Sequence, residues 1–247
     1  FKNTKFDFII ASIPDHYITY ERLRKQYQPQ AKLICQMGNV GWEQLEILNQ
    51  HIVRNLLASV KPFNVSNMIN ALFYYQEQPV EDYMPSDIRN ESIKSFVHLL
   101  PLAKQYEAYK QALAPEFIMQ AFGSLAPDGL MPSLQALYYA MQDANFIYQV
   151  KPGGDGYGWN WHSAFMLGRP ILTNFSDYKD KLGGLLFEDM VTGIDLEKRT
   201  IQENCEILKG MDELSQTLGE AARKRWKKTV NYEDQANNIQ DFLSKAI

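Results

Sequence analysis

Short apolar runs alternate with amphipathic segments along the first part of the chain. The runs at 6–12, 32–36 and 54–60 have the length and composition of buried strands. The segments 14–27 and 42–49 lie between these runs and place their apolar residues at helical spacing. Such alternation of strands and helices is expected of a parallel sheet covered by helices.

The same alternation returns further along the chain. Strands are predicted at 93–100, 116–122, 146–150, 171–173 and 192–196, and helices at 102–113, 133–141, 159–167, 200–208, 211–230 and 233–246. Gly168 is predicted to end the helix 159–167. We therefore predict an α/β protein with two Rossmann-like lobes, each with a parallel sheet, and additional C-terminal helices.

A polar stretch separates the two sets of elements. Residues 76–91 contain two prolines and show neither the helical nor the strand period. We predict a partial N-terminal lobe at 1–78, a linker at 79–91, a second lobe at 92–230, and a helix at 231–247 that packs back towards the first lobe. The first strand begins within a few residues of Phe1, so we expect further sequence upstream and regard the N-terminal lobe as incomplete.

A glycine-rich segment follows the predicted strand 146–150 and precedes the predicted helix 159–167. Its glycines are Gly153, Gly154, Gly156 and Gly158. Glycines let the backbone approach a ligand closely, and the start of a helix adds a partial positive charge, so an anion such as a diphosphate is the expected ligand. Lys151 can reach the same anion, and Asp155 can accept a hydrogen bond from a sugar or ribose hydroxyl. The alternative is a turn that only packs a helix against a sheet.

These residues also carry a family resemblance. The run Asp155-Gly156-Tyr157-Gly158, followed by Ala164, Gly168 and Pro170, resembles the donor-site signature of retaining glycosyltransferases of the GT-B fold, group 1. That signature reads Glu-Gly-Phe-Gly, with a second Glu separated from the first by seven residues, then Ala and Gly-x-Pro. Aligned without gaps, Asp155 takes the place of the first Glu and Ser163 that of the second. The resemblance implies a nucleotide-sugar site.

Because Ser163 replaces the second Glu, the sequence does not decide which residue contacts the nucleoside. In the resembled family this Glu holds the ribose hydroxyls, which Ser163 cannot do as an ion. Either Ser163 or the neighbouring His162 substitutes, or the contact is absent. A neutral imidazole at His162 can donate to a phosphate or sugar oxygen, but an imidazole that only satisfies nearby backbone groups fits the sequence equally well.

Five further positions lie at or after the ends of predicted strands. Ser124 follows the strand 116–122, and Tyr178 and Lys181 follow the strand 171–173, so all three are secondary candidates for the donor site. Asp15 also stands at a strand end beside His16, where a helix N-cap is the more common role. We assign no catalytic residue from the sequence.

Composition excludes several classes of function. The 247 residues are 45% apolar and 22% charged with a net charge of −4, as in a soluble globular protein without the broad basic field of a nucleic-acid binder. No apolar run is long enough to span a membrane. Cys35 and Cys205 have no partners at metal-ligand spacing, so we expect buried thiols, no metal site, and a cytoplasmic location.

A basic helical face is the last charged feature. It is formed by Arg223, Lys224, Lys227 and Lys228 together with Glu220, and such a charged face is most often solvated. A peripheral contact with anionic lipid is the alternative.

Three functions follow from these observations. The first is a metal-independent glycosyltransferase of the hexosyltransferase type, which transfers a sugar from a nucleotide-diphosphate sugar to a glycan, lipid-linked or protein acceptor, as in polysaccharide biosynthesis. The nucleotide sugar is then a substrate, and no cofactor is required. The second is a non-catalytic module with a degenerate donor site that binds a nucleotide sugar or a protein. The third is a sugar-nucleotide epimerase of the same architecture.

Overall fold

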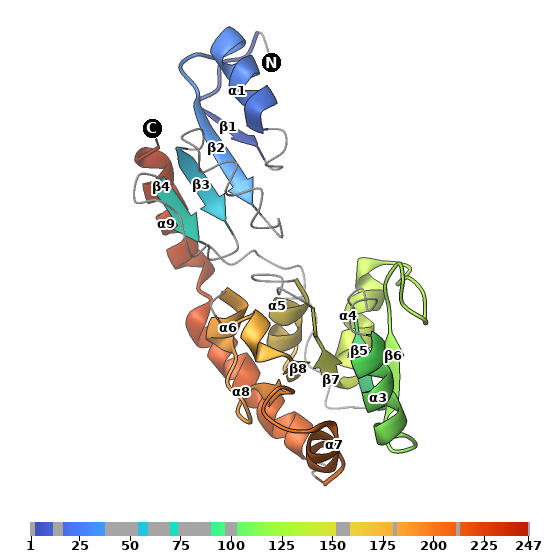
Figure 1. Ribbon diagram of the computed structural model, residues 1–247. Coiled ribbons are helices and arrows are strands. Elements are labelled where there is room, and N and C mark those ends of the chain that lie inside the picture. The colour runs from blue at the N-terminus through green and yellow to red at the C-terminus, as the bar shows by residue number, and fades with distance from the viewer. Residues whose placement is uncertain are drawn as a thin grey trace. The chain divides into compact units, whose positions relative to one another are not determined.

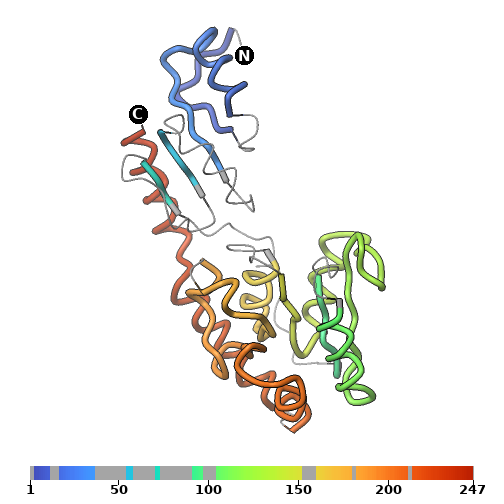
Figure 2. Tube along the Cα trace, in the orientation of Figure 1, coloured from blue at the N-terminus to red at the C-terminus, as the bar shows by residue number. Residues whose placement is uncertain are grey.

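The computed structural model describes residues 3–11, 17–37, 54–58, 70–73, 90–96, 103–151, 159–179, 182–210 and 213–246 (Figure 1). The chain divides into two compact units. Unit 1 combines residues 1–76 with 231–247, and unit 2 comprises residues 77–230. Unit 1 therefore contains both ends of the chain, the blue and the red segments in Figure 2.

Unit 1 contains a four-stranded parallel sheet in the order β1-β2-β3-β4. The strands are β1 (Phe8–Ala11), β2 (Lys32–Met37), β3 (Asn55–Ala58) and β4 (Asn70–Phe73), and the helices within its described residues are α1 (Tyr17–Tyr27) and α9 (Tyr232–Ser244). Side chains alternate between the faces of a strand, so neighbouring residues of β2 enter different clusters. Leu33 packs with Tyr17 of α1 and Ile34 packs with Phe242 of α9.

Unit 2 contains a five-stranded parallel sheet in the order β6-β5-β7-β8-β9. The strands are β5 (Asn90–Ser95), β6 (Ile118–Ala121), β7 (Ala144–Tyr148), β8 (Ile171–Thr173) and β9 (Gly193–Asp195). The helices are α3 (Ala103–Leu113), α4 (Leu134–Gln142), α5 (Trp159–Met166), the 3-10 helix η3 (Phe175–Asp177), α6 (Leu182–Leu186), α7 (Ile201–Gly210) and α8 (Leu214–Thr229).

The main core of unit 2 lies between its sheet and helices α3, α7 and α8. Ile93, Phe146 and Tyr148 contribute from the strands, and Tyr106 and Leu218 contribute from the helices. All three residues of β8 are buried, as is typical of a parallel sheet that is covered on both faces.

Helix ends in this unit follow local sequence rules. The Ser133 side chain accepts a hydrogen bond from the Ala136 amide, at 3.1 Å, and so caps the start of α4. Gly168 follows α5 with a φ of 66°, in the left-handed region that glycine occupies without strain, and this confirms the predicted helix stop.

The predicted fold class is confirmed, and several element boundaries are corrected. β4 was not predicted, and neither was helix α6, which lies in the apolar run 182–187. β5 covers Asn90–Ser95, whereas the predicted strand began at Ile93 and continued to Leu100. The predicted helix 42–49 lies outside the described residues, as do Asp15, His16 and most of the predicted linker.

Candidate functional site

The carboxyl edge of the sheet in unit 2 is the candidate site, because open α/β sheets bind ligands at this edge. β7 ends at Tyr148 and α5 begins at Trp159, so the predicted unit of strand, loop and helix is present. Lys151 is half-buried shortly after the end of β7. The remaining loop candidates, Gly153, Gly154, Asp155, Gly156, Tyr157 and Gly158, lie outside the described residues, and so does Lys181.

A pair of amide side chains joins the two ends of this loop. Asn160, in the first turn of α5, donates from Nδ2 to Oε1 of Gln149 at 3.1 Å and to the carbonyl of Phe96 at 3.2 Å. Gln149 is fully buried directly after β7, and Thr173 Oγ1 donates to its carbonyl at 2.7 Å. The start of α5 is therefore tied to the carboxyl ends of β5, β7 and β8. Sequence analysis missed both amides, because only their spatial proximity reveals the pair.

Tyr178, a predicted secondary donor residue, is fully buried after η3. Its hydroxyl accepts a hydrogen bond from Nε2 of Gln149 at 3.4 Å, and its ring lies against Trp161 with centroids 4.7 Å apart. Tyr178 thus supports the amide pair from the interior of unit 2.

His162 is also fully buried, one helical turn into α5. Nε1 of Trp226, on α8, donates to Nδ1 of His162 at 3.4 Å, and the two rings meet edge to face. Burial lowers the pKa of His162 to about 3, so the imidazole is neutral near pH 7. These contacts favour a structural role between α5 and α8.

The two candidate serines have different environments. Ser163 is buried within α5, whereas Ser124 is exposed after β6. A short hydroxyl at Ser163 reaches less far from the helix than the Glu of the resembled signature would.

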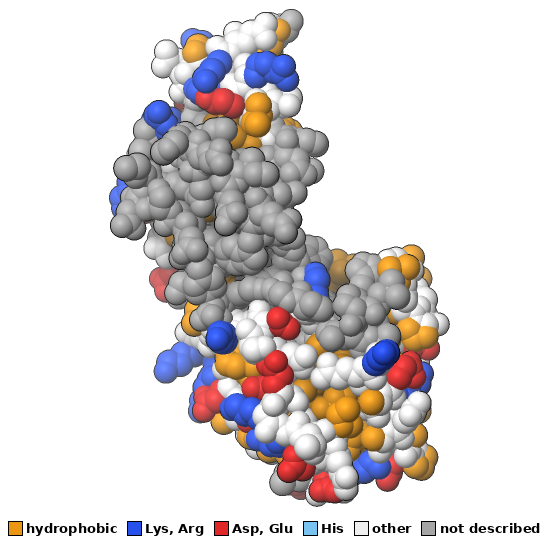
Figure 3. All heavy atoms as spheres, viewed as in Figure 1, with side chains coloured by type: hydrophobic (Ala, Val, Ile, Leu, Met, Phe, Trp, Pro, Cys, Tyr) orange, Lys and Arg blue, Asp and Glu red, His pale blue; other side chains and the backbone are white. Residues whose placement is uncertain are grey.

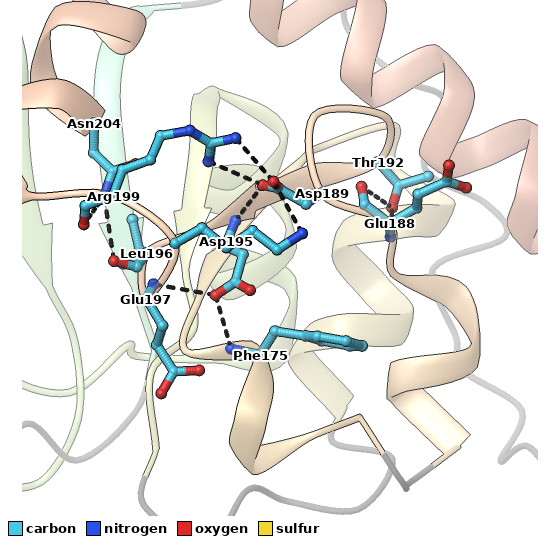
Figure 4. Close-up of polar contacts among 10 residues, drawn as sticks. Phe175, Glu188, Asp189, Thr192, Asp195, Leu196, Glu197, Arg199 and Asn204 are labelled. Carbon is cyan, nitrogen blue, oxygen red and sulfur yellow. Dashed lines mark hydrogen bonds and ion pairs between the residues drawn. The ribbon is translucent and has the colours of Figure 1, made fainter.

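Ion pairs and hydrogen bonds brace the loops that follow β8 and β9 (Figure 4). Oδ1 of Asp195, at the end of β9, accepts from the amides of Phe175 at 3.3 Å and Glu197 at 3.1 Å. Oδ1 of Asp189 accepts from the Asp195 amide at 2.9 Å, and its two oxygens pair with Arg199. Backbone groups at this edge are therefore held by carboxylates.

Opposing effects act on the carboxyl group of Asp189. Burial alone would raise its pKa, but hydrogen bonds from Arg199 and from the Asp195 amide bring the pKa below the ordinary value. Asp189 is therefore ionised near pH 7 and acts as the centre of the brace.

Side chains that could bind a metal are scattered over the described parts of the chain. Among these residues, no three His, Cys, Asp or Glu side chains are grouped so that they could hold a metal ion. Cys35 and Cys205 are buried free thiols, and burial raises the pKa of Cys35 to about 12. No helix in the same parts is long and apolar enough to cross a membrane.

Solved structures share this fold. A mutant of TarM from S. aureus, crystallised with Fondaparinux, alpha-GlcNAc-glycerol and UDP, matches with a TM-score of 0.72 and 11% identity over 96% of this chain and 55% of its own. HepE from Anabaena, crystallised with UDP-glucose, matches with a TM-score of 0.72 and 13% identity over 96% of this chain and 78% of its own. The chain has the fold of GT-B glycosyltransferases.

A glycosyltransferase from Rickettsia africae is a third match, with a TM-score of 0.59 and 14% identity over 97% of this chain and 77% of its own. The chain spans about half the length of TarM. No protein-family profile matches the sequence, and no curated protein is similar enough to count as a match. The predicted GT-B fold is thus confirmed by structural similarity.

Proposed function

We propose that the chain is part of a glycosyltransferase that takes its sugar from a nucleotide-diphosphate sugar bound by unit 2. The observation that carries this proposal is the β7–α5 connection at the carboxyl edge of a GT-B sheet, with Lys151 at its start. Crystals of HepE with UDP-glucose and of TarM with UDP support a nucleotide sugar and make UDP the first nucleotide to test.

The proposed chemistry is stabilisation of a departing diphosphate. The partial positive charge at the start of α5 and the ammonium of Lys151 oppose the charge that develops on the leaving group. The glycine-rich segment 153–158 supplies backbone amides, and Asp155 binds a donor hydroxyl. Because these groups offset the negative charge, transfer is proposed to proceed without a metal, with a hexose as the transferred sugar and a glycan, lipid-linked or protein acceptor.

Calorimetry with UDP tests the donor site. Replacement of Lys151 by Ala removes a charge-assisted hydrogen bond and should weaken binding by about 1.5–3 kcal/mol. The matched control is Lys227→Ala, an exposed lysine on α8 that should leave the affinity unchanged. Equal UDP affinity in folded wild-type and Lys151→Ala protein would rule out this assignment.

The second candidate function is a non-catalytic module that binds a nucleotide sugar or a protein. It is favoured by Ser163, a buried hydroxyl where the resembled signature has a carboxylate, and by His162, which contacts Trp226. Incubation of the full-length protein with UDP-sugars separates the two functions. Release of UDP by transfer or hydrolysis supports the enzyme, whereas UDP binding without any release supports the module.

A further inference from the structure

Unit 1 contains a cavity of about 560 Å³ beside α1, at the amino-terminal ends of β2 and β3. Tyr17, Glu21, Arg24 and Lys25 line it from one flank of α1, and Arg54 lines it from the residue before β3. The cavity belongs to unit 1 alone, whereas the proposed donor site lies in unit 2.

One wall of the cavity is held rigidly by Arg24. Its Nε and NH2 atoms donate to the two carboxylate oxygens of Glu21 at 2.7 Å and 3.0 Å. Its NH1 atom donates to the carbonyls of Pro29 and Ala31, each at 3.2 Å. All three nitrogens of this guanidinium are therefore engaged, and Arg24 acts as a support for the turn that follows α1.

Arg54 lines the same cavity. The Tyr17 hydroxyl hydrogen-bonds the backbone of Arg54, which places the start of β3 against α1. Burial, with a contribution from Glu21, raises the pKa of Tyr17 to about 12, so its hydroxyl keeps its proton. Within the described residues, the guanidinium of Arg54 forms no hydrogen bond or ion pair with another side chain.

The charges around the cavity do not cancel. Lys32 also lines the cavity and keeps its charge, although its ammonium donates to the carbonyl of Ala246 at 2.8 Å. Among the described residues that line the cavity, Glu21 carries the one negative charge, and the positive charges belong to Arg24, Lys25, Lys32 and Arg54, which leaves an excess of three positive charges. Lys and Arg side chains of unit 1 are visible in blue on the face that Figure 3 shows.

We propose that this cavity binds a phosphate group, free or as a phosphate monoester. Such a group carries a charge of roughly −1.5 to −2 near pH 7, which the excess of positive charge balances. Arg54 supplies the planar fork that pairs with two phosphate oxygens, and Lys25 supplies a flexible ammonium. The binding site is independent of the donor site in unit 2.

Titration of the whole chain with inorganic phosphate, followed by ¹H–¹⁵N NMR at constant ionic strength, tests the proposal. No UDP is added, because its terminal phosphate would compete for the same cavity, and the signal is read in unit 1, away from the proposed donor site in unit 2. The reporter is the side-chain amide of Gln30, which also lines the cavity. We expect a saturable shift of this resonance in the wild type.

Variants identify the binding groups. Arg54→Ala should weaken phosphate binding about tenfold or more, because a charged hydrogen-bonding partner is lost. Arg22→Ala is the matched control, since Arg22 is on the same flanking helix α1 and does not line the cavity, and it should bind as the wild type does. Arg54→Gln replaces Arg54→Ala if the latter does not fold.

Two results would overturn the proposal. One is the absence of a saturable shift in the wild type, and the other is equal weakening by Arg54→Ala and Arg22→Ala, which would indicate general screening. Glycerol phosphate in place of inorganic phosphate distinguishes the two sources of the group, because tighter binding of the ester assigns the site to a phosphate monoester. The result does not depend on whether UDP binds to unit 2.

Discussion

At the scale of single residues, burial decides what a polar side chain does. His162 follows the glycine-rich segment closely in sequence, yet it is buried and accepts a hydrogen bond from Trp226. A neutral imidazole in this position makes the stability of unit 2 depend on pH, because the unfolded chain binds a proton that the folded chain excludes.

The sign of this dependence follows from the two pKa values. The ordinary pKa of histidine is about 6.5 and that of folded His162 is about 3, so its contribution is constant above pH 6.5 and is lost progressively as the pH falls towards 3. We expect the wild type to lose about 2 kcal/mol more than His162→Asn between pH 7 and pH 5, as measured by urea unfolding. Parallel pH profiles of the two proteins would contradict a neutral buried His162.

Loss of the Asn160 side chain should affect the position of the start of α5, which follows the glycine-rich segment. Replacement by Ala leaves Oε1 of the buried Gln149 without this donor, at a cost of about 1–3 kcal/mol in unfolding free energy. UDP affinity should fall as well, because α5 loses its link to β7. The control is Asn237→Ala, an exposed asparagine on α9. If the free energy of unfolding changes no more than in the control, the hydrogen bond between Asn160 and Gln149 does not stabilise the protein.

At the scale of elements, a backbone contact between glycines sets the packing of α5 against α8. A methyl group added at Gly219 would lie 2.0 Å from the carbonyl oxygen of Gly168, and backbone cannot move aside as a side chain can. Gly219→Ala should therefore destabilise the protein by about 1–3 kcal/mol through overpacking.

A second glycine provides the control for this prediction. Gly210 ends α7 and has no atom within 4 Å of an added methyl group, so Gly210→Ala should stabilise the protein slightly through helix propensity. Thermal and urea unfolding measure the stability of both variants. The same Gly→Ala change is then compared at a crowded position, Gly219, and at an uncrowded one, Gly210. Similar effects of the two substitutions would be inconsistent with the close contact at Gly168.

At the scale of the whole molecule, unit 1 is assembled from both ends of the chain. Phe242 of α9 packs with Ile34 of β2 and Leu57 of β3. Phe242→Ala removes a buried aromatic ring and should cost about 3–5 kcal/mol. Native-state hydrogen exchange should show the loss in residues 1–76, although the substitution lies near the C-terminus, and leave unit 2 unchanged.

The matched control is Ile18→Ala, because Ile18 is a large apolar side chain of unit 1 that is 59% exposed. Its exchange pattern should remain close to that of the wild type. Faster exchange spread evenly over both units of the Phe242→Ala protein would show that the units do not unfold separately.

The sequence by itself determined the class of the fold, because strand and helix signals are local. Ile171–Thr173 was predicted as β8 with its boundaries, and Gly168 was predicted as the stop of α5, since β-branched runs and a left-handed glycine act through their own backbone. The resemblance in 155–170 also indicated the GT-B fold that structural similarity confirms. The roles of Lys151 and Asp155 remain predictions.

Only the tertiary structure decided the roles of residues whose partners are distant in sequence. His162 accepts a hydrogen bond from Trp226, and Asn160 donates one to the carbonyl of Phe96. The two ends of the chain belong to the same unit. The spacing of apolar residues along the sequence predicts none of these contacts. β4 was missed for the same reason, because a short run such as Asn70–Phe73 becomes a strand by pairing with β3. Local patterns specify which elements form, whereas burial and hydrogen-bond partners depend on how those elements pack.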